Sequence, residues 1–148
     1  MAFIPAKANG NIYPCRFVSM DASSAPGTDF KVLEDIIVAA NIAGISQEGT
    51  DWPPITDSHI TNAGYAAIAG ENVKVFGEGE ICLLQIADTV TAGQLLRANA
   101  TTDGKGIPVN IAGSPTTPQP YGALALQSGS SGDKILVQVR CGVYTYHA

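Results

Sequence analysis

The chain of 148 residues is 45% hydrophobic and only 14% charged, a balance that allows a buried core and argues against disorder. Its net charge is −5, and its eight basic residues are scattered along the chain. A nucleic-acid binder needs a basic stripe, and a membrane-spanning helix needs roughly 18 consecutive apolar residues. Because the sequence has neither feature, we expect no nucleic-acid partner and no membrane partner.

Sixteen glycines and nine prolines interrupt the chain often, which is typical of short strands joined by tight turns. The composition therefore predicts a mainly β protein with long loops and little helix. We expect an N-terminal arm over residues 1–11 and a single β-rich domain over residues 12–148.

The arm is predicted because Met1–Asn11 has no clear period and contains a proline and a glycine. It nevertheless carries Phe3 and Ile4, two apolar side chains that a free tail has little reason to hold. We expect both to bind a partner surface. The alternative is that they pack on the protein's own barrel, which would make the arm an internal strand.

The next segments in chain order also favour strands. Ile12–Met20 is rich in β-branched and aromatic residues and ends at a turn-rich stretch. Phe30–Ile37 fits both a strand and a helical face, and we favour the strand. Asn72–Gln85 contains two alternating runs around Gly77-Glu78-Gly79, a pattern that predicts a β-hairpin.

The C-terminal segment has the clearest alternation in the chain. Ile135, Val137, Val139, Cys141 and Val143 fall on one face of a single long strand. The opposite face is mixed and too apolar to be left in water, so we expect the protein to self-associate, most simply as a homotrimer.

Two proline-rich stretches predict loops, over 51–69 and over 112–120. Consecutive prolines cannot lie in a central strand, because neither donates to the ladder. The first loop holds Trp52, Pro53 and Pro54, and a large rigid tryptophan is a typical binding hot spot. We expect these three residues to contact a partner; the alternative is that Trp52 caps the barrel end.

A weak internal repeat is also visible. Phe17 and Leu95 begin similar segments, as do Ile42 and Pro120, and the first pair is 95 − 17 = 78 residues apart. Gly44 and Gly122 share that spacing, since 122 − 44 = 78. The equal offsets suggest two duplicated β-units, although chance could supply the few identities.

Residues capable of catalysis or metal binding are sparse. His59 lies near Asp51 and Asp57 in the sequence, but no third ligand is evident, so a surface histidine is expected. The three cysteines (Cys15, Cys82 and Cys141) form no C-x-x-C pair and are expected to be small buried hydrophobes, with a disulfide left open. No nucleophile elbow or phosphate-binding loop is present, so neither an enzyme nor a cofactor is predicted.

One turn is similar to that of biotinyl and lipoyl carrier domains. Asp88-Thr89-Val90-Thr91-Ala92-Gly93-Gln94-Leu95-Leu96 matches their D-x-V-x-x-G-Q-x-L pattern. Those carriers display a lysine at a hairpin tip, whereas Gly77-Glu78-Gly79 has none and Lys74 falls in a predicted strand. The match therefore indicates a turn of a small β-barrel and no cofactor.

The order of several motifs resembles that of the decoration (cement) proteins on tailed-phage heads. These motifs are Ile42–Thr50, Asn72–Gln85, Val90–Leu96, Thr102–Gly106, Tyr121–Leu126 and Gly132–Val137. The resemblance covers about Ile12 to Val143 and implies a small β-barrel or β-tulip-like module. It further implies a non-enzymatic virion protein, often trimeric, that stabilises the capsid surface by bridging major capsid protein subunits. The alternatives are another phage tail or baseplate module, or a carbohydrate-binding module.

Overall fold

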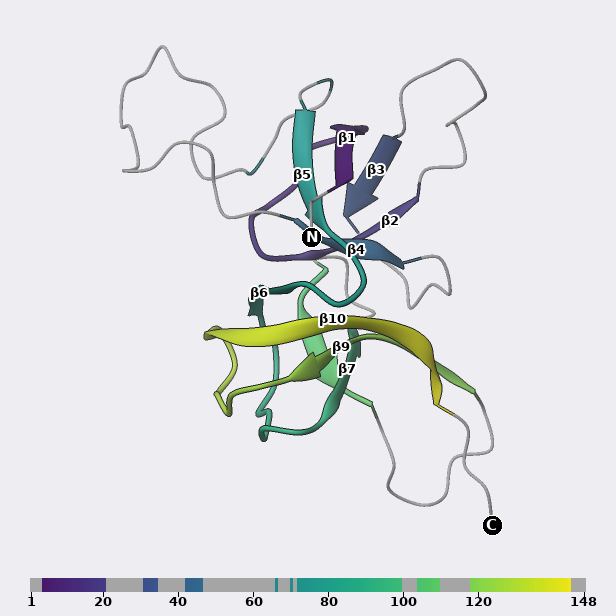
Figure 1. The fold of residues 1–148 in the computed structure, drawn as a ribbon. Coiled ribbons are helices and arrows are strands. Elements are labelled where there is room, and N and C mark those ends of the chain that lie inside the picture. Colours follow the sequence, from purple (N-terminus) through teal and green to yellow (C-terminus); the bar gives the residue numbers. More distant parts are fainter. Residues whose placement is uncertain are drawn as a thin grey trace, which may run out of the picture.

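The computed structural model describes residues 4–20, 31–34, 42–46, 66, 70, 72–99, 104–109 and 118–144. Across these ranges the regular structure consists of ten strands, and none of the described residues is helical. The prediction of a mainly β protein is confirmed. The strands form two groups of five that lie one above the other (Figure 1).

The first unit, residues 4–76, is a closed barrel with the strand order β1-β3-β2-β4-β5. The second unit, residues 81–144, is a sheet with the order β6-β10-β9-β7-β8. The first unit contains β1 (Ile4–Ala8), β2 (Phe17–Met20), β3 (Lys31–Glu34), β4 (Ile42–Ser46) and β5 (Asn72–Phe76). The second contains β6 (Ile81–Gln85), β7 (Leu95–Ala98), β8 (Gly106–Pro108), β9 (Gln119–Ala125) and β10 (Lys134–Tyr144).

The two units share one topology. In both, the first strand pairs antiparallel with the fifth, the fifth with the fourth, the fourth with the second and the second with the third. The remaining contact, between the first and third strands, is parallel: Ala8 pairs with Val32 in the first unit, and Ile86 bridges Gly106 in the second. The strand order therefore repeats along the chain.

The pairing register repeats as well. Phe17 opposes Ile45 on β2 and β4, and Leu95 opposes Leu124 on β7 and β9. The 78-residue offset seen in the sequence thus relates β2 to β7. Along β4 and β9 the offset is 124 − 45 = 79, so the pairing makes Ala123, rather than Gly122, the counterpart of Gly44.

The turns follow the same correspondence. The Ser46 amide donates to the Arg16 carbonyl, and the Ala125 amide donates to that of Gln94, each at 2.8–2.9 Å. Cys15 has a φ of 58°, and its counterpart Gly93 has a φ of 95°. A left-handed backbone costs a non-glycine residue roughly 1–2 kcal/mol. The first unit accepts this cost at Cys15, whereas the second unit has a glycine at the equivalent position, where the conformation is unstrained.

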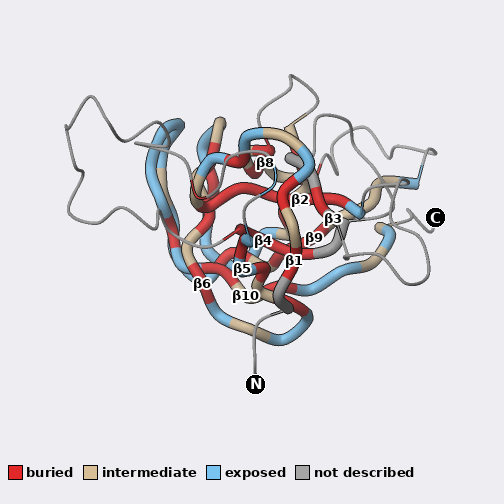
Figure 2. Tube along the Cα trace, turned by 90° about the horizontal axis from the view of Figure 1, so that it is seen from above, coloured by how far each residue is buried: buried red, intermediate tan, exposed pale blue. Residues whose placement is uncertain are grey.

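Each unit is built around a cluster of buried apolar residues. Figure 2 shows where the buried residues fall along the strands of both units. The core of the first unit is Ala6, Ala8, Ile12, Val18, Val32, Ala66, Val73 and Val75. The larger cluster belongs mainly to the second unit, but Phe17 and Ile45 of the first unit are also members. The two units are therefore joined by apolar packing.

The prediction of an N-terminal arm outside the core is wrong. Ile4–Ala8 is β1, which pairs with β3 and β5 and closes the first barrel. Ala6 and Ala8 are 5% and 2% exposed. The segment escaped detection because its inward residues are alanines, which are depleted in strands and give little hydrophobic signal.

The predicted Asn72–Gln85 hairpin is also wrong, although both strands exist. β5 pairs with β1 and β4, whereas β6 pairs with β10. The turn at Gly77–Glu80 is instead the connection between the two units, where the Glu80 amide donates to the Gly77 carbonyl at 3.1 Å. Three other strand expectations can be compared. β3 lies within Phe30–Ile37, and within Ile12–Met20 the strand β2 begins only at Phe17. The C-terminal segment is β10, which buries Ile135, Val137 and Val139 but leaves Val143 exposed.

Gly44 is required where β4 bulges against β2, because its backbone lies close to β5. An added Cβ would collide with the Phe76 carbonyl oxygen and would lie 2.8 Å from Val75 Cγ1. We expect Gly44→Ala to destabilise the protein by about 3 kcal/mol, the upper end for overpacking. Chemical denaturation would measure this, with Gly10→Ala, whose Cβ would meet nothing within 4 Å, as the reference. A Gly44→Ala variant no less stable than Gly10→Ala would show that the close approach is not required.

Candidate interaction surface

Of the predicted partner-binding residues, only Ile4 lies in a described part of the chain. Its backbone pairs with Val75 in the first barrel, so it belongs to a strand of this protein and not to a free docking arm. Phe3, Trp52, Pro53 and Pro54 lie outside the described residues. His59, Asp51 and Asp57 lie outside them too.

The two units meet where the second sheet is open, between β6 and β8, and the first unit packs into this opening. In the described part of the chain, the ends of β6 and β8 meet at the Ile86–Gly106 bridge, and the segment Cys15–Phe17 lies beside them. The Gln85 amide donates to the Cys15 carbonyl at 2.9 Å, and the Phe17 amide donates to the Gly104 carbonyl at 2.8 Å. The backbone groups of the second unit's open side are thus satisfied by the first unit.

Side chains reinforce the junction. Phe17 is fully buried in the core of the second unit, and its ring lies 3.5 Å from the position of a Cβ on Gly106. Arg16 is only 8% exposed; its guanidinium donates to Gln85 Oε1 at 2.9 Å and lies 5.1 Å from the centre of the Tyr13 ring. The junction is therefore both apolar and hydrogen-bonded, as expected for a fixed interface rather than a hinge.

The side of the second sheet that faces away from the core carries exposed aliphatic residues. Along β6 and β10, burial alternates, with Cys82, Leu84, Ile135 and Val137 directed into the core. The side chains that point outward include several aliphatic residues, which together form what we call the outer face: Ile81, Leu83, Leu95, Leu124, Leu126 and Leu136. Ile81 is 58% exposed and Leu136 is 38% exposed.

These residues lie next to one another in the pairing register. One row runs across four strands as Ile81, Gln138, Leu124 and Leu95. In the next row Leu83 opposes Leu136, whose carbonyl accepts a hydrogen bond from the Leu126 amide at 2.9 Å. The outer face is therefore mainly aliphatic, with Gln138 between Ile81 and Leu124, and an exposed apolar surface of this kind often marks an interaction site. At one end, Gly93, Gln94, Leu95, Val109 and Tyr144 line a cavity of about 260 Å³.

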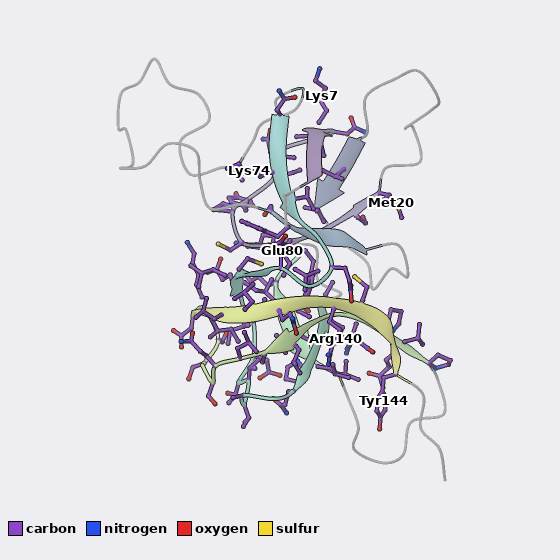
Figure 3. The ribbon with its side chains drawn as sticks, in the orientation of Figure 1. Lys7, Met20, Lys74, Glu80, Arg140 and Tyr144 are labelled. Atoms are coloured by element: carbon purple, nitrogen blue, oxygen red, sulfur yellow. The ribbon has the colours of Figure 1, made fainter. Side chains whose placement is uncertain are left out.

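The carrier-like motif is the turn between β6 and β7 of the second sheet. The Gln94 Oε1 accepts from the Thr91 amide at 2.7 Å, Gly93 takes the left-handed conformation, and Val90 is buried beside Gly129. Lys74 lies on β5, in the other unit, and Glu80 stands at the connection between the units (Figure 3). The motif thus has a structural explanation in the turn itself.

None of the three cysteines forms a disulfide. Cys15 and Cys82 are buried, as expected, whereas the expectation of burial is wrong for Cys141, which is exposed. It is exposed because β10 bulges between Val139 and Gly142, which ends the inward alternation. Burial, with smaller effects from Cys15 and Glu80, raises the pKa of Cys82 to about 12.

The Cys141 thiol is accessible but is expected to react slowly. Partial burial, and then the charge and hydrogen bond of Glu78, raise its pKa from 9.0 to about 11. At pH 8 the thiolate fraction should be about a hundredfold below that of an unperturbed thiol, since the thiolate is the reactive form. We expect alkylation of the native protein to accelerate about tenfold per pH unit up to roughly pH 11. Peptide mapping of iodoacetamide-treated protein would measure the rate.

Glu78→Gln is the matched variant, because it removes the charge while keeping an acceptor. Cys141 should then react faster at pH 8, with its rate reaching a plateau at lower pH. Equal labelling of native and urea-unfolded wild-type protein at pH 8 would contradict the raised pKa.

Among the described residues, no group of three histidine, cysteine or acidic side chains could hold a metal ion. The described ranges also include no helix long and apolar enough to cross a membrane.

The chain is similar in fold to a solved phage structure. No family model matches the chain, and no curated protein matches it. Among solved structures, it is similar to the N base of the head fibre protein gp8.5 of bacteriophage phi29, with a TM-score of 0.54 and 12% sequence identity. The match covers 93% of this chain and 92% of that one. At this identity the similarity concerns the fold, and it includes both five-stranded units.

Proposed function

We propose that the protein is a non-enzymatic structural component of a tailed-phage virion that sits on the outer surface of the head. There it stabilises the capsid by bridging neighbouring major capsid protein subunits. The observation that carries the proposal is the match over nearly the whole chain to the base of a phage head fibre. The order of motifs that resembles decoration proteins points independently to the same surface.

The arrangement of the described residues supports a binding role. The two units are held together by buried packing and main-chain hydrogen bonds, so they form a rigid block. The outer face and the loops around it offer contact area on that block. A protein that resists pressure on a shell needs rigidity and contact area.

The proposal is tested on virions produced with and without the gene. Mass spectrometry of gradient-purified particles should find the protein in wild-type virions in many copies. Purified protein added back to particles that lack it should rebind and raise the temperature at which they release DNA. Absence from purified virions, or rebinding to tails alone, would overturn the head-surface assignment.

A further inference from the structure

The strands of the second sheet carry only basic charges. In β6 to β10 the charged residues are Arg97, Lys134 and Arg140, although the whole chain has a net charge of −5. Each of the three adjoins a buried residue in the alternating pattern of its strand and therefore points away from the core. Lys134 and Arg140 are exposed, and Arg97 is partly buried. Folding thus gathers positive charge on the side of the sheet that carries the outer face.

The pairing register places the two arginines in one row. Leu96 opposes Ala123, which in turn opposes Val139. β7 and β10 are both antiparallel to β9, so they run in the same direction. The next residues along these two strands are Arg97 and Arg140 (Figure 3). Their backbones are therefore two strand spacings apart, roughly 10 Å.

The charge of this row is not neutralised within the described part of the chain. Gly122 of β9 lies between the arginines and places no side chain there. Among the described residues, no acidic side chain pairs with Arg97 or Arg140, and the buried Arg97 Nε has no hydrogen-bond partner. Three acidic side chains of this unit instead accept main-chain amides at turns and at the edge of β10: Asp88, Asp133 and Glu78.

An apolar cavity lies on the same side of the sheet. Leu95 precedes Arg97 by two residues and shares its outward direction, and with Val109 and Tyr144 it lines the cavity of about 260 Å³. The outer face continues from Leu95 across the strand pair to Leu124. A nucleic acid would match the charge but not the leucines, and it needs more basic residues than these three. A segment with both carboxylates and apolar side chains matches both.

We infer that this side of the second sheet binds an acidic segment of the major capsid protein, with a carboxylate between Arg97 and Arg140 and an apolar side chain in the cavity beside Leu95. The inference rests on the proposed function and names the chemistry of its partner. A guanidinium donates two parallel hydrogen bonds to a carboxylate, which makes arginine suited to such a contact. Neighbouring leucines shelter the contact from water, so salt screens it less than a fully exposed ion pair.

Binding of the purified protein to heads that lack it tests the inference. Arg140→Gln, at an exposed position, should raise the dissociation constant about tenfold, as expected for the loss of a charge-assisted hydrogen bond. Arg97→Gln should have a similar effect. Arg140→Lys should retain part of the affinity, because it keeps the charge but loses the paired donors. Added salt should weaken binding of the wild type and weaken binding of the variant with both glutamines much less.

Lys74→Gln is the matched control, because it removes the same charge from an exposed strand position of the first unit. This variant should bind heads like the wild type, and thermal unfolding should show that every variant is folded. Folded Arg97→Gln and Arg140→Gln variants that bind heads like the wild type would overturn the inference and leave the proposed function standing. A wild-type protein that does not bind heads would overturn both. Binding to duplex DNA that the same substitutions abolish would assign the arginines to phosphate and also overturn the inference.

Discussion

Deletion of residues 1–11 should abolish the folded first unit. The deletion removes β1, which supplies main-chain partners to both β3 and β5 and closes the barrel. It also removes two buried alanines and exposes the core beneath them, including Val73 and Val75. A domain is stable by only about 5–15 kcal/mol, and the loss of a whole paired strand is comparable with that margin. Circular dichroism and thermal unfolding of the 12–148 fragment would measure the effect.

A shorter deletion provides the control. Removing residues 1–3 leaves β1 intact and should change the unfolding temperature far less. If the 12–148 fragment unfolds with the cooperativity and melting temperature of the full chain, β1 is not part of the barrel and the segment is an arm.

Replacement of Phe17 by alanine should have the next largest effect. Its ring is fully buried between the units, and removal of a buried phenylalanine typically costs about 3–5 kcal/mol. Because the ring belongs to β2 of one unit and packs in the core of the other, its loss should also weaken the coupling between them. We expect a lower denaturation midpoint and separate transitions for the two units in calorimetry.

Leu95→Ala is the matched comparison, since Leu95 occupies the corresponding position and is only partly buried. It should lower the stability of the monomer by much less. Equal losses for Phe17→Ala and Leu95→Ala in a monomeric background would contradict the assignment of Phe17 to the junction.

The sequence predicts this fold best where one face of a strand is strongly apolar. Ile135, Val137 and Val139 alternate with Leu136, Gln138 and Arg140, and the inward face of β10 was predicted correctly as far as Val139. On β6 both faces are apolar, because Ile81 and Leu83 alternate with Cys82 and Leu84. Periodicity alone then does not show which face of β6 is buried, and only the structure places Ile81 and Leu83 on the outward face.

Strand partners were harder to infer than strands. The turn Gly77–Glu80 has the composition of a hairpin, and local sequence cannot show that the strands on either side pair elsewhere. β1 was missed for a different reason: its buried positions are the small residues Ala6 and Ala8, which pair with Val73 and Val32.

The internal repeat is a relation between distant parts of the chain that the sequence partly revealed. The similarity of Phe17–Met20 and Leu95–Ala98 reflects equivalent strands, but only the pairing shows that the offset is 78 residues along β2 and β7 and 79 residues along β4 and β9. The outer face could not be identified without the pairing register. Its residues are as apolar as core residues, and only the register shows that they lie on the outward face.

The most direct test of the account is cryo-electron microscopy of heads from wild-type phage and from phage that lack this gene. The difference map should show density only on the outside of the shell, over junctions between major capsid protein subunits, into which the two stacked five-stranded units can be fitted. Identical maps, or difference density confined to the tail or to the interior of the head, would contradict the proposed role.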